Sequence, residues 1–392
     1  MPEFFYDYHL SGGDRILALI RRIFHNYPEF RHDSFKHAAR LAPFIPFFAG
    51  RPDLSKNLQR IVRFEDNSNP LYFGCPVILA AGANKTAKRI SDYANVGFGG
   101  ISVGTATRNF REGNTHKPRI GFIEKERAIH NSMGLNNEGV DVIASRVDMQ
   151  LTKAHKKGLS VGISVAETPG LTTDDEKLKD IAECFSKAYK TGDYIEINVS
   201  CPNTGENRLD LDTHFSELLF SEIVKIKKAS AIKKAVFAKL SPDLSEASLR
   251  ALLEIISEYG LNGVVLGNTF PTAKMAALPV ETSYDSLNAL RADGDKGGLS
   301  GRPLYENMYR NVEFVRTHYP KLKVMACGGI DHGFKIFDLL NLGVCAVQCY
   351  SVVAFRWLAA HAMRKELLQA LRANGFKTLK DFDVALNHQD FL

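Results

Sequence analysis

The sequence predicts an α/β protein, a (β/α)8 barrel that carries a small helical extension at its N-terminus. Three observations lead to this prediction. The chain has 392 residues, of which 45% are hydrophobic and 24% charged, and this suits one large barrel with an addition. From Leu71 onward, short β-rich runs alternate with helical patterns. The first β-rich run leads into AAGANK (80–85), not into the Gly-x-Gly-x-x-Gly turn of a doubly wound sheet.

Eight strands are expected, each a short run of β-branched and small apolar residues. In chain order they span residues 77–81, 100–104, 160–165, 194–199, 236–240, 263–267, 323–326 and 346–349. Helices are expected between them, for example over 140–157, 174–189, 215–228, 245–259 and 304–318, where apolar residues recur at helical spacing. Eight strand–helix units are the count of a TIM barrel.

The N-terminal segment, residues 1–66, differs from the barrel domain, residues 67–392. A helix is expected from Asp14 to Phe24 and a second from Asp33 to Leu41, followed by a very apolar stretch at 41–50. The first 64 residues hold ten Lys or Arg and six Asp or Glu, so they contribute +4 to a formal net charge of +6. Such a segment suits either an anionic membrane surface or a helical hairpin packed on its own domain.

The composition excludes several classes of protein. No run approaches the roughly 20 apolar residues that span a bilayer, and the acidic start of the chain does not resemble a signal peptide. Six cysteines, at positions 75, 184, 201, 327, 345 and 349, are too few for a disulfide scaffold, and none is spaced as C-x-x-C. We therefore expect reduced thiols in a cytosolic setting and no metal site.

Polar residues and glycines lie at or just after the carboxyl end of nearly every predicted strand, where such barrels place their active sites. In strand order these residues are Lys85; Thr105; Asn198, Cys201 and Asn203; Lys239; Asn268 and Thr269; Gly328 and Gly329; and Tyr350 and Ser351. The connections over 105–139 and 268–303 are long, and loops of that length in compact domains are commonly functional.

Asparagines are prominent in this set: Asn131, in the first long connection, joins Asn198, Asn203 and Asn268. Each offers one acceptor and two donors without charge, so together they suit a planar ligand rich in carbonyl and N–H groups, such as a pyrimidine. Asparagines in loops are more often turn formers. Their joint placement at strand ends is what favours a binding site.

Other residue types at the strand ends extend this interpretation. Lys85 and Lys239 suit a carboxylate or an electron-rich ring. The glycines at 297–301 and 328–329 suit a phosphate held by backbone N–H groups. Cys201 is a candidate acid or base, although a single cysteine is more often an inert buried residue.

Segments along nearly the whole chain resemble those of the dihydroorotate dehydrogenases, the flavin enzymes of pyrimidine synthesis. The matching segments are PVILAAGANK (76–85), GGISVGTATRNFREGNTHKPR (99–119), AIHNSMGLNNEGVD (128–141), INVSCPNTGENRL (197–209), AKLSPDLSE (238–246), GVVLGNTF (263–270), GGLSGRPL (297–304), ACGGID (326–331) and QCYS (348–351). The N-terminal helices, including residues 32–48, resemble the membrane-associating extension of class 2, the quinone-reducing type.

The resemblance implies FMN as cofactor, dihydroorotate as substrate, orotate as product and a quinone as electron acceptor, with no role for nucleic acid. The residues implied to contact FMN are Ala81, Gly82, Lys85, Thr105, Asn198, Lys239, Gly301, Gly329, Tyr350 and Ser351. Those implied to hold dihydroorotate are Lys85, Asn131, Leu135, Asn198, Asn203, Asn268 and Thr269. His37, Arg119 and Tyr350 would lie on the quinone side. Cys201, Lys85 and Lys239 would be the catalytic residues.

Several positions depart from the class 2 pattern. Cys201 stands at the position of the catalytic base, where class 2 usually has serine and the soluble class 1 has cysteine. The other departures are Ser164 for a flavin-contacting asparagine, Leu135 for an aromatic residue beside the substrate, Gly267 for a threonine, and altered runs at 166–172 and 205–209. These changes concern the substrate more than the flavin.

In the implied reaction, Cys201 takes the C5 proton of dihydroorotate while hydride leaves C6 for the flavin. Lys239 would stabilise the negative charge of the reduced flavin. Since the chain has no Arg-rich presequence, we expect peripheral association with the cytoplasmic side of a bacterial inner membrane through the N-terminal helices. A cytoplasmic protein is the alternative.

Three other functions remain open. An FMN enzyme of the same frame could act on another small unsaturated or dihydropyrimidine substrate. A tRNA dihydrouridine synthase would share the barrel and the Cys-Pro pair, but it needs an RNA-binding surface, and only about 40 residues without a basic cluster follow the last strand. A non-enzymatic barrel that binds a membrane or a partner would not need the lysines, Cys201 and the asparagines together.

Overall fold

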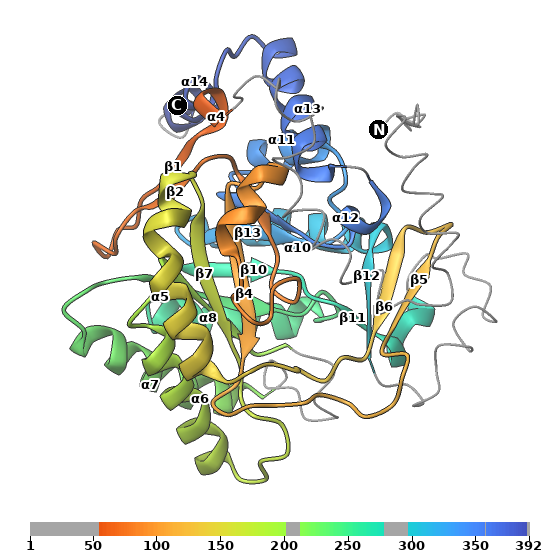
Figure 1. Ribbon diagram of the computed structural model, residues 1–392. Coiled ribbons are helices and arrows are strands. Elements are labelled where there is room, and N and C mark those ends of the chain that lie inside the picture. The colour runs from red at the N-terminus through yellow and green to blue at the C-terminus, as the bar shows by residue number, and fades with distance from the viewer. Residues whose placement is uncertain (1–54, 201–211, 278–296, 357, 390–392) are drawn as a thin grey trace.

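The computed structural model describes residues 55–200, 212–277, 297–356 and 358–389. Eight parallel strands close into a barrel (Figure 1). In chain order they are β3 (Val77–Leu79), β4 (Gly100–Ala106), β7 (Ser160–Val165), β8 (Tyr194–Asn198), β9 (Ala235–Leu240), β10 (Gly263–Leu266), β13 (Lys323–Cys327) and β14 (Ala346–Cys349). Strand β14 pairs with β3 and completes the circle. The predicted (β/α)8 TIM barrel is confirmed, with all eight expected strands.

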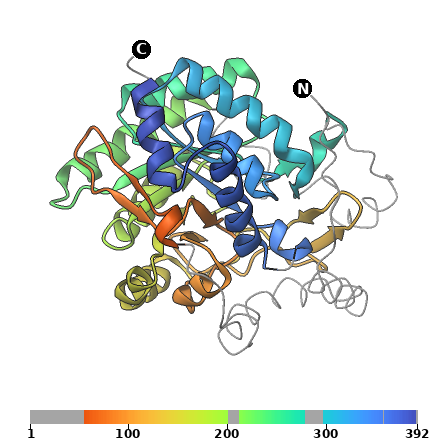
Figure 2. The same cartoon turned by 90° about the horizontal axis from the view of Figure 1, so that it is seen from above.

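Helices lie on the outside of the barrel (Figures 1 and 2). Those between the strands include α5 (Val140–Lys156), α6 (Asp174–Ala188), α7 (Thr213–Ala229), α8 (Glu246–Glu258), α10 (Tyr305–His318) and α11 (Gly333–Asn341), and the 3-10 helix η2 (Ile90–Val96) follows β3. The chain ends with α12 (Val352–Phe355), α13 (Ala359–Ala373) and α14 (Leu379–Gln389). The five helices predicted from periodicity are confirmed. Within the described ranges, none of the helices has the length and apolar character needed to cross a membrane.

Polar side chains fix where several of these helices begin. Thr173 caps α6, because its hydroxyl accepts the backbone N–H of Glu176 at 3.3 Å and the Glu176 carboxylate accepts the N–H of Thr173 at 3.2 Å. Asp212 and Ser245 cap α7 and α8 through similar hydrogen bonds. These caps satisfy N–H groups that a helix otherwise leaves unpaired. Each cap therefore fixes the residue at which its helix begins.

Alternate side chains of each barrel strand point to opposite faces. In β8, Ile195 and Ile197 pack in the core between strands and helices, whereas Tyr194 belongs to a separate cluster inside the barrel. A Cβ at Gly162 of the adjacent strand would come within 2.3 Å of the Tyr194 ring, so only glycine leaves room for that ring. By the same alternation, Glu196 also faces the barrel interior.

A pair of antiparallel strands packs on the amino-terminal end of the barrel. It consists of β1 (Arg60–Val62) and β2 (Leu71–Phe73), and it follows the short helix α4 (Ser55–Leu58). The Phe73 ring meets the Tyr194 ring edge to face at a centroid distance of 6.4 Å, so this pair completes the interior core. The domain boundary predicted at residue 66 lies in the connection between these strands. The two predicted N-terminal helices lie outside the described residues.

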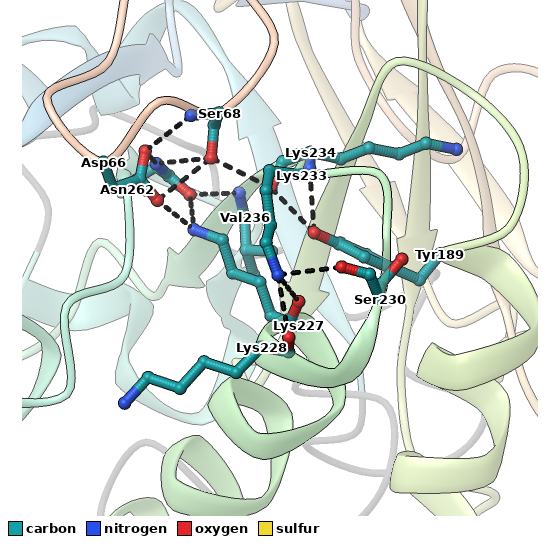
Figure 3. A network of polar contacts seen from close by, with 10 residues as sticks. All are labelled: Asp66, Ser68, Tyr189, Lys227, Lys228, Ser230, Lys233, Lys234, Val236 and Asn262. Carbon is teal, nitrogen blue, oxygen red and sulfur yellow. Dashed lines mark hydrogen bonds and ion pairs between the residues drawn. The ribbon is translucent and has the colours of Figure 1, made fainter.

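A polar network ties this connection to the barrel (Figure 3). The Lys227 ammonium, from α7, donates to Asp66 Oδ2 at 2.5 Å and to Asn262 Oδ1 at 2.6 Å. Asn262 Nδ2 donates to Asp66 Oδ1 at 2.9 Å. Burial alone would raise the pKa of Asp66, but hydrogen bonds from Lys227 and Ser68 outweigh it and lower the pKa. The network therefore stabilises an ionised carboxylate at the amino-terminal end of the barrel.

The two long connections form a second, antiparallel sheet. Its order is β11-β12-β6-β5, with β5 (Ile120–Ile123), β6 (Ala128–Asn131), β11 (Phe270–Pro271) and β12 (Gly298–Gly301). The sequence analysis did not predict these strands, because they are very short and their partners are distant in the chain. Asn131 and Gly298, which are paired in this sheet, lie 167 residues apart. Figure 1 shows the sheet at the right of the molecule, away from β1 and β2.

Candidate active site

A large cavity opens at the carboxyl ends of the barrel strands, with about 1120 Å³ of space that includes volume open to solvent. The barrel strands and the loops that follow them contribute Ala81, Gly82, Lys85, Thr105, Asn198, Lys239, Asn268, Thr269, Gly329, Tyr350 and Ser351. The antiparallel sheet and the loop after β6 contribute Asn131, Leu135 and Gly301. Every described residue that was predicted to hold FMN or dihydroorotate therefore lines one cavity.

The amide side chains form a connected polar wall. Asn198 Nδ2 donates to Thr105 Oγ1 at 3.1 Å. Asn268 Nδ2 donates to Asn198 Oδ1 at 3.2 Å and to Ser200 Oγ at 3.0 Å. Asn131 Nδ2 lies 3.5 Å from a backbone carbonyl oxygen of β12. These hydrogen bonds fix the direction of each amide, so a planar ligand meets polar groups that are already oriented.

Lys85 reaches the same cavity from the loop after β3. Its ammonium donates to Asn136 Oδ1 at 2.5 Å. The neighbouring Asn137 holds this loop in shape, because its side-chain carbonyl accepts two backbone N–H groups at 3.2 and 2.8 Å. Leu135 has a φ of 57°, a conformation that is uncommon for residues with a side chain. Lys85 and the loop that carries Leu135 are thus positioned together at the cavity.

A lysine and a buried carboxylate lie together inside the barrel at the base of the cavity. The Lys239 ammonium, from β9, lies 3.4 Å from Gln348 Oε1 and 3.9 Å from Glu196 Oε2. Glu196 is fully buried and accepts hydrogen bonds from Ser102 and Gln348. The sequence analysis identified Lys239 but missed Glu196 and Gln348. In the sequence, each of these two residues can be recognised as a polar residue within an otherwise apolar strand.

Glycine backbone forms part of the cavity wall. Gly82, Gly301 and Gly329 have φ values of 100°, 118° and 66°, which favour glycine. A Cβ at Gly82 would meet nothing within 4 Å, so the backbone there borders open space. A Cβ at Gly329 would lie 2.6 Å from the backbone nitrogen of Tyr305. A ligand can therefore approach the main chain closely at this side of the barrel.

A charged cluster supports the loop after Gly329. Asp331 Oδ1 lies 2.9 Å from both Lys335 Nζ and His332 Nδ1, and Asp331 Oδ2 lies 3.3 Å from Arg302 Nε. Burial alone would raise the pKa of Asp331, but hydrogen bonds with His332 and Lys335 outweigh it and hold the pKa well below its usual range. The loop that borders the cavity is thus anchored by an ionised carboxylate.

Some predicted residues are not among those that line the cavity. Cys201, Asn203 and His37 lie outside the described residues. Arg119 is described, but it is not a lining residue, and its guanidinium donates to the backbone carbonyl of Glu112 at 3.3 Å. Tyr350, the third residue predicted for the quinone side, does line the cavity.

The cavity also has apolar walls that the sequence analysis missed. Ile120, Ile129 and Met133 come from the antiparallel sheet and its loop, and Cys327 comes from β13. Burial raises the pKa of the Cys327 thiol, so this cysteine acts as a neutral apolar residue. Apolar walls combined with oriented amides suit a flat ligand with an apolar face and polar edges.

Comparisons with known proteins show which family the chain belongs to. A family profile described as dihydroorotate dehydrogenase matches residues 65–371. The chain is 32% identical over 291 residues to the dihydroorotate dehydrogenase (quinone) of Legionella pneumophila (strain Corby), covering 73% of this chain and 82% of the relative. It is 32% identical over 303 residues to the protein of the same name from Neisseria meningitidis serogroup B, covering 76% and 84%.

A solved structure of a member of the same family also matches the fold of this chain. The crystal structure of DHODH from Eimeria tenella in complex with ferulenol matches with a TM-score of 0.74 at 25% identity, covering 90% of this chain and 94% of that one. These matches confirm the family resemblance and favour it over a tRNA dihydrouridine synthase or a non-enzymatic barrel. The cavity and the matched sequence together give one conclusion: the chain belongs to the dihydroorotate dehydrogenase family, whose members are flavin-dependent.

Proposed function

We propose that this protein oxidises dihydroorotate to orotate, with FMN as cofactor and a quinone as electron acceptor. The observation that carries the proposal is the convergence of three oriented asparagines with Lys85 and Lys239 on one cavity. Dihydroorotate presents ring carbonyl and N–H groups together with a carboxylate. The amides suit the ring groups, and Lys85 suits the carboxylate.

The residues of the cavity fit FMN. The backbone at Gly82 borders open space, and the main chain at Gly329 and Ser351 lies at the cavity wall, where backbone N–H groups would hold a phosphate. FMN, when bound, supplies the acceptor for the hydride that leaves C6 of the substrate. Lys239 would stabilise the negative charge that this transfer creates, because little water screens charges inside the barrel.

The chain's own residues would position the substrate and remove its proton. Lys85 and the asparagines would hold the ring in one orientation, which lowers the entropic cost of the reaction. Cys201 would take the C5 proton on its Sγ as the C5–C6 double bond forms. A free cysteine has a pKa of about 8.5, so a useful fraction of thiolate forms near neutral pH.

The quinone part of the proposal is supported by the relatives and by the N-terminal segment. The proteins from Legionella and Neisseria carry the name dihydroorotate dehydrogenase (quinone). The helices predicted within residues 1–66 would lie on the cytoplasmic side of a bacterial inner membrane and give a lipid-soluble quinone access to the site. His37, Arg119 and Tyr350 would serve this second half of the reaction.

An anaerobic reaction tests the proposal. Purified protein loaded with FMN is mixed with dihydroorotate while the flavin absorbance is followed, and a short-chain quinone or fumarate is then added to separate aliquots. We expect bleaching by dihydroorotate and recovery with quinone alone. Recovery with fumarate would contradict the quinone assignment. Bleaching by another dihydropyrimidine, such as dihydrouracil, without bleaching by dihydroorotate would contradict the substrate.

A further inference from the structure

A fully buried carboxylate lies next to the candidate cofactor site, and the proposed mechanism does not use it. Glu196, in β8, is 0% exposed. Within the described part of the chain, its Oε2 accepts no hydrogen bond, and it lies 3.9 Å from Lys239 Nζ. Burying a charged carboxylate costs free energy unless it is well paired. A carboxylate held in this way is therefore a candidate for a functional role.

The hydrogen bonds around Glu196 all run toward it. An ionised carboxylate can only accept, so Ser102 Oγ and Gln348 Nε2 both donate to Glu196 Oε1. Ser102 Oγ in turn accepts from the Tyr194 hydroxyl at 2.8 Å. Burial, and after it the charge of Glu196, raises the pKa of Tyr194 well above its usual value, so the phenol remains a donor.

The orientation of Gln348 links the carboxylate to the cavity. Because Gln348 turns its amide N–H toward Glu196, its Oε1 faces Lys239 at 3.4 Å. Lys239 and Gln348 both line the cavity, whereas Glu196 does not. Among the residues that the structure describes, Glu196 is the one carboxylate within 4 Å of the Lys239 ammonium. This ammonium also faces the cavity, where a second negative charge would form.

The charge balance of the site follows from this arrangement. With Glu196 ionised, the pair formed by Lys239 and Glu196 carries no net charge. Hydride transfer would move two electrons and one proton from the substrate to the flavin, so the flavin would gain one negative charge. Charges a few ångströms apart in a poorly screened interior interact strongly. Glu196 therefore opposes the arriving charge, while Lys239 favours it.

We propose that Glu196 is a positioning residue that holds the Lys239 ammonium at the cavity wall and limits how strongly this lysine favours the reduced flavin. The proposal rests on the function proposed above, with FMN as the bound flavin. Glu196 thereby sets how readily the electrons pass on to the next acceptor. If Glu196 carried no charge, Lys239 would stabilise the reduced flavin more strongly.

Redox titration of the FMN-loaded protein tests this role. Glu196→Gln removes the charge and nearly keeps the shape, and Glu196→Asp keeps the charge. For E196Q we expect the equilibrium of two-electron reduction to shift at least tenfold toward reduced flavin, which corresponds to a midpoint potential about 30 mV higher. The E196D protein should remain within about threefold of wild type.

Thermal unfolding of the same proteins separates this role from a purely structural one. A lower unfolding temperature of E196Q with an unchanged midpoint potential would overturn the proposal. If E196Q does not fold, Ser102→Ala supplies the second measurement, because it removes one donor to the carboxylate without changing any charge. The carboxylate then keeps its charge but loses a donor that partly offsets it, so the midpoint potential should fall by a smaller amount than it rises in E196Q. An unchanged potential would again overturn the proposal. Wild-type protein that binds no FMN would contradict the proposed function instead.

Discussion

Two buried lysines lie at opposite ends of the barrel, and their surroundings differ. At the amino-terminal end, Lys227 donates to Asp66 at 2.5 Å and to Asn262 at 2.6 Å (Figure 3). At the carboxyl end, Lys239 lies 3.9 Å from Glu196, and its ammonium faces the cavity. Short contacts made entirely within the protein stabilise the fold. The longer contacts of Lys239 leave much of its electrostatic interaction for a bound ligand.

The largest expected effect comes from replacing the proposed base, Cys201, which leaves both lysines in place. We expect Cys201→Ser to lower the turnover rate near pH 7 by about 10²- to 10⁴-fold, because serine ionises far less readily than a thiol. The wild-type rate should rise with pH through the pKa of the thiol, which is about 8.5 for a free cysteine. Steady-state rates between pH 6 and 10 measure both effects. Equal rates of the two proteins at every pH would remove Cys201 from this role.

The second largest effect is expected from replacing Lys239, the lysine at the carboxyl end of the barrel. Lys239→Met should slow the reduction of bound flavin by dihydroorotate by about 10²- to 10³-fold, the usual cost of removing one preorganised charge partner. Stopped-flow absorbance under anaerobic conditions measures this rate. A loss of less than about tenfold would show that other groups stabilise the developing charge.

The same substitution at the other end is the matched control. Lys227→Met removes a donor from Asp66 and from Asn262, so we expect a loss of about 2 kcal/mol in the free energy of unfolding. Flavin reduction per bound flavin should be unchanged. Urea unfolding and stopped-flow absorbance measure the two quantities. If both lysine variants slowed flavin reduction equally, the division between the two ends of the barrel would be wrong.

The smallest expected effect is on stability, and it comes from Glu167, another carboxylate near the carboxyl end of the barrel. Glu167 follows β7, and its Oε2 accepts no hydrogen bond from any residue that the structure describes. Burial raises the pKa of Glu167 from 4.5 to about 7. The unfolded chain therefore loses this proton at lower pH than the folded protein does, and stability falls as pH rises from about 4.5 to 7.

Glu167→Gln removes the carboxyl group, and with it the loss of stability at higher pH. We expect the variant to be more stable than wild type by about 1–2 kcal/mol at pH 8 and equally stable at pH 4, where the carboxyl is protonated in both states. Urea unfolding at the two pH values measures the difference. Equal stability at pH 8 would show that Glu167 is paired or solvated in solution.

The barrel could be predicted because its strands have local sequence patterns. Each strand is a run of apolar, often β-branched residues, such as VGISV at 161–165, and the intervening helices repeat their apolar residues at helical spacing. The antiparallel sheet has no such pattern. Strand β11 has only two residues, Phe270–Pro271, and its pairing depends on tertiary contacts between the two long connections.

Most of the site could be predicted because its polar residues lie at or just after the carboxyl ends of the strands. Lys85, Asn198 and Asn268 were found in this way, and all of them line the cavity. Glu196 and Gln348 were missed because they lie within strands, where side-chain direction and not sequence position decides access to the cavity. Their partners Ser102 and Lys239 come from two other strands, β4 and β9, so no short segment of sequence contains the cluster.

The antiparallel sheet also has a consequence for the order in which the chain folds. Its strands β6 and β12 carry Asn131 and Gly301 to the cavity, yet their paired residues lie as far as 173 positions apart, from Ala128 to Gly301. Joining such distant segments is entropically costly until the closing barrel brings them together. We therefore expect the cavity to be completed late in folding. An incomplete barrel lacks a wall for the pyrimidine, and only the finished chain gains the stabilisation that ligand binding supplies.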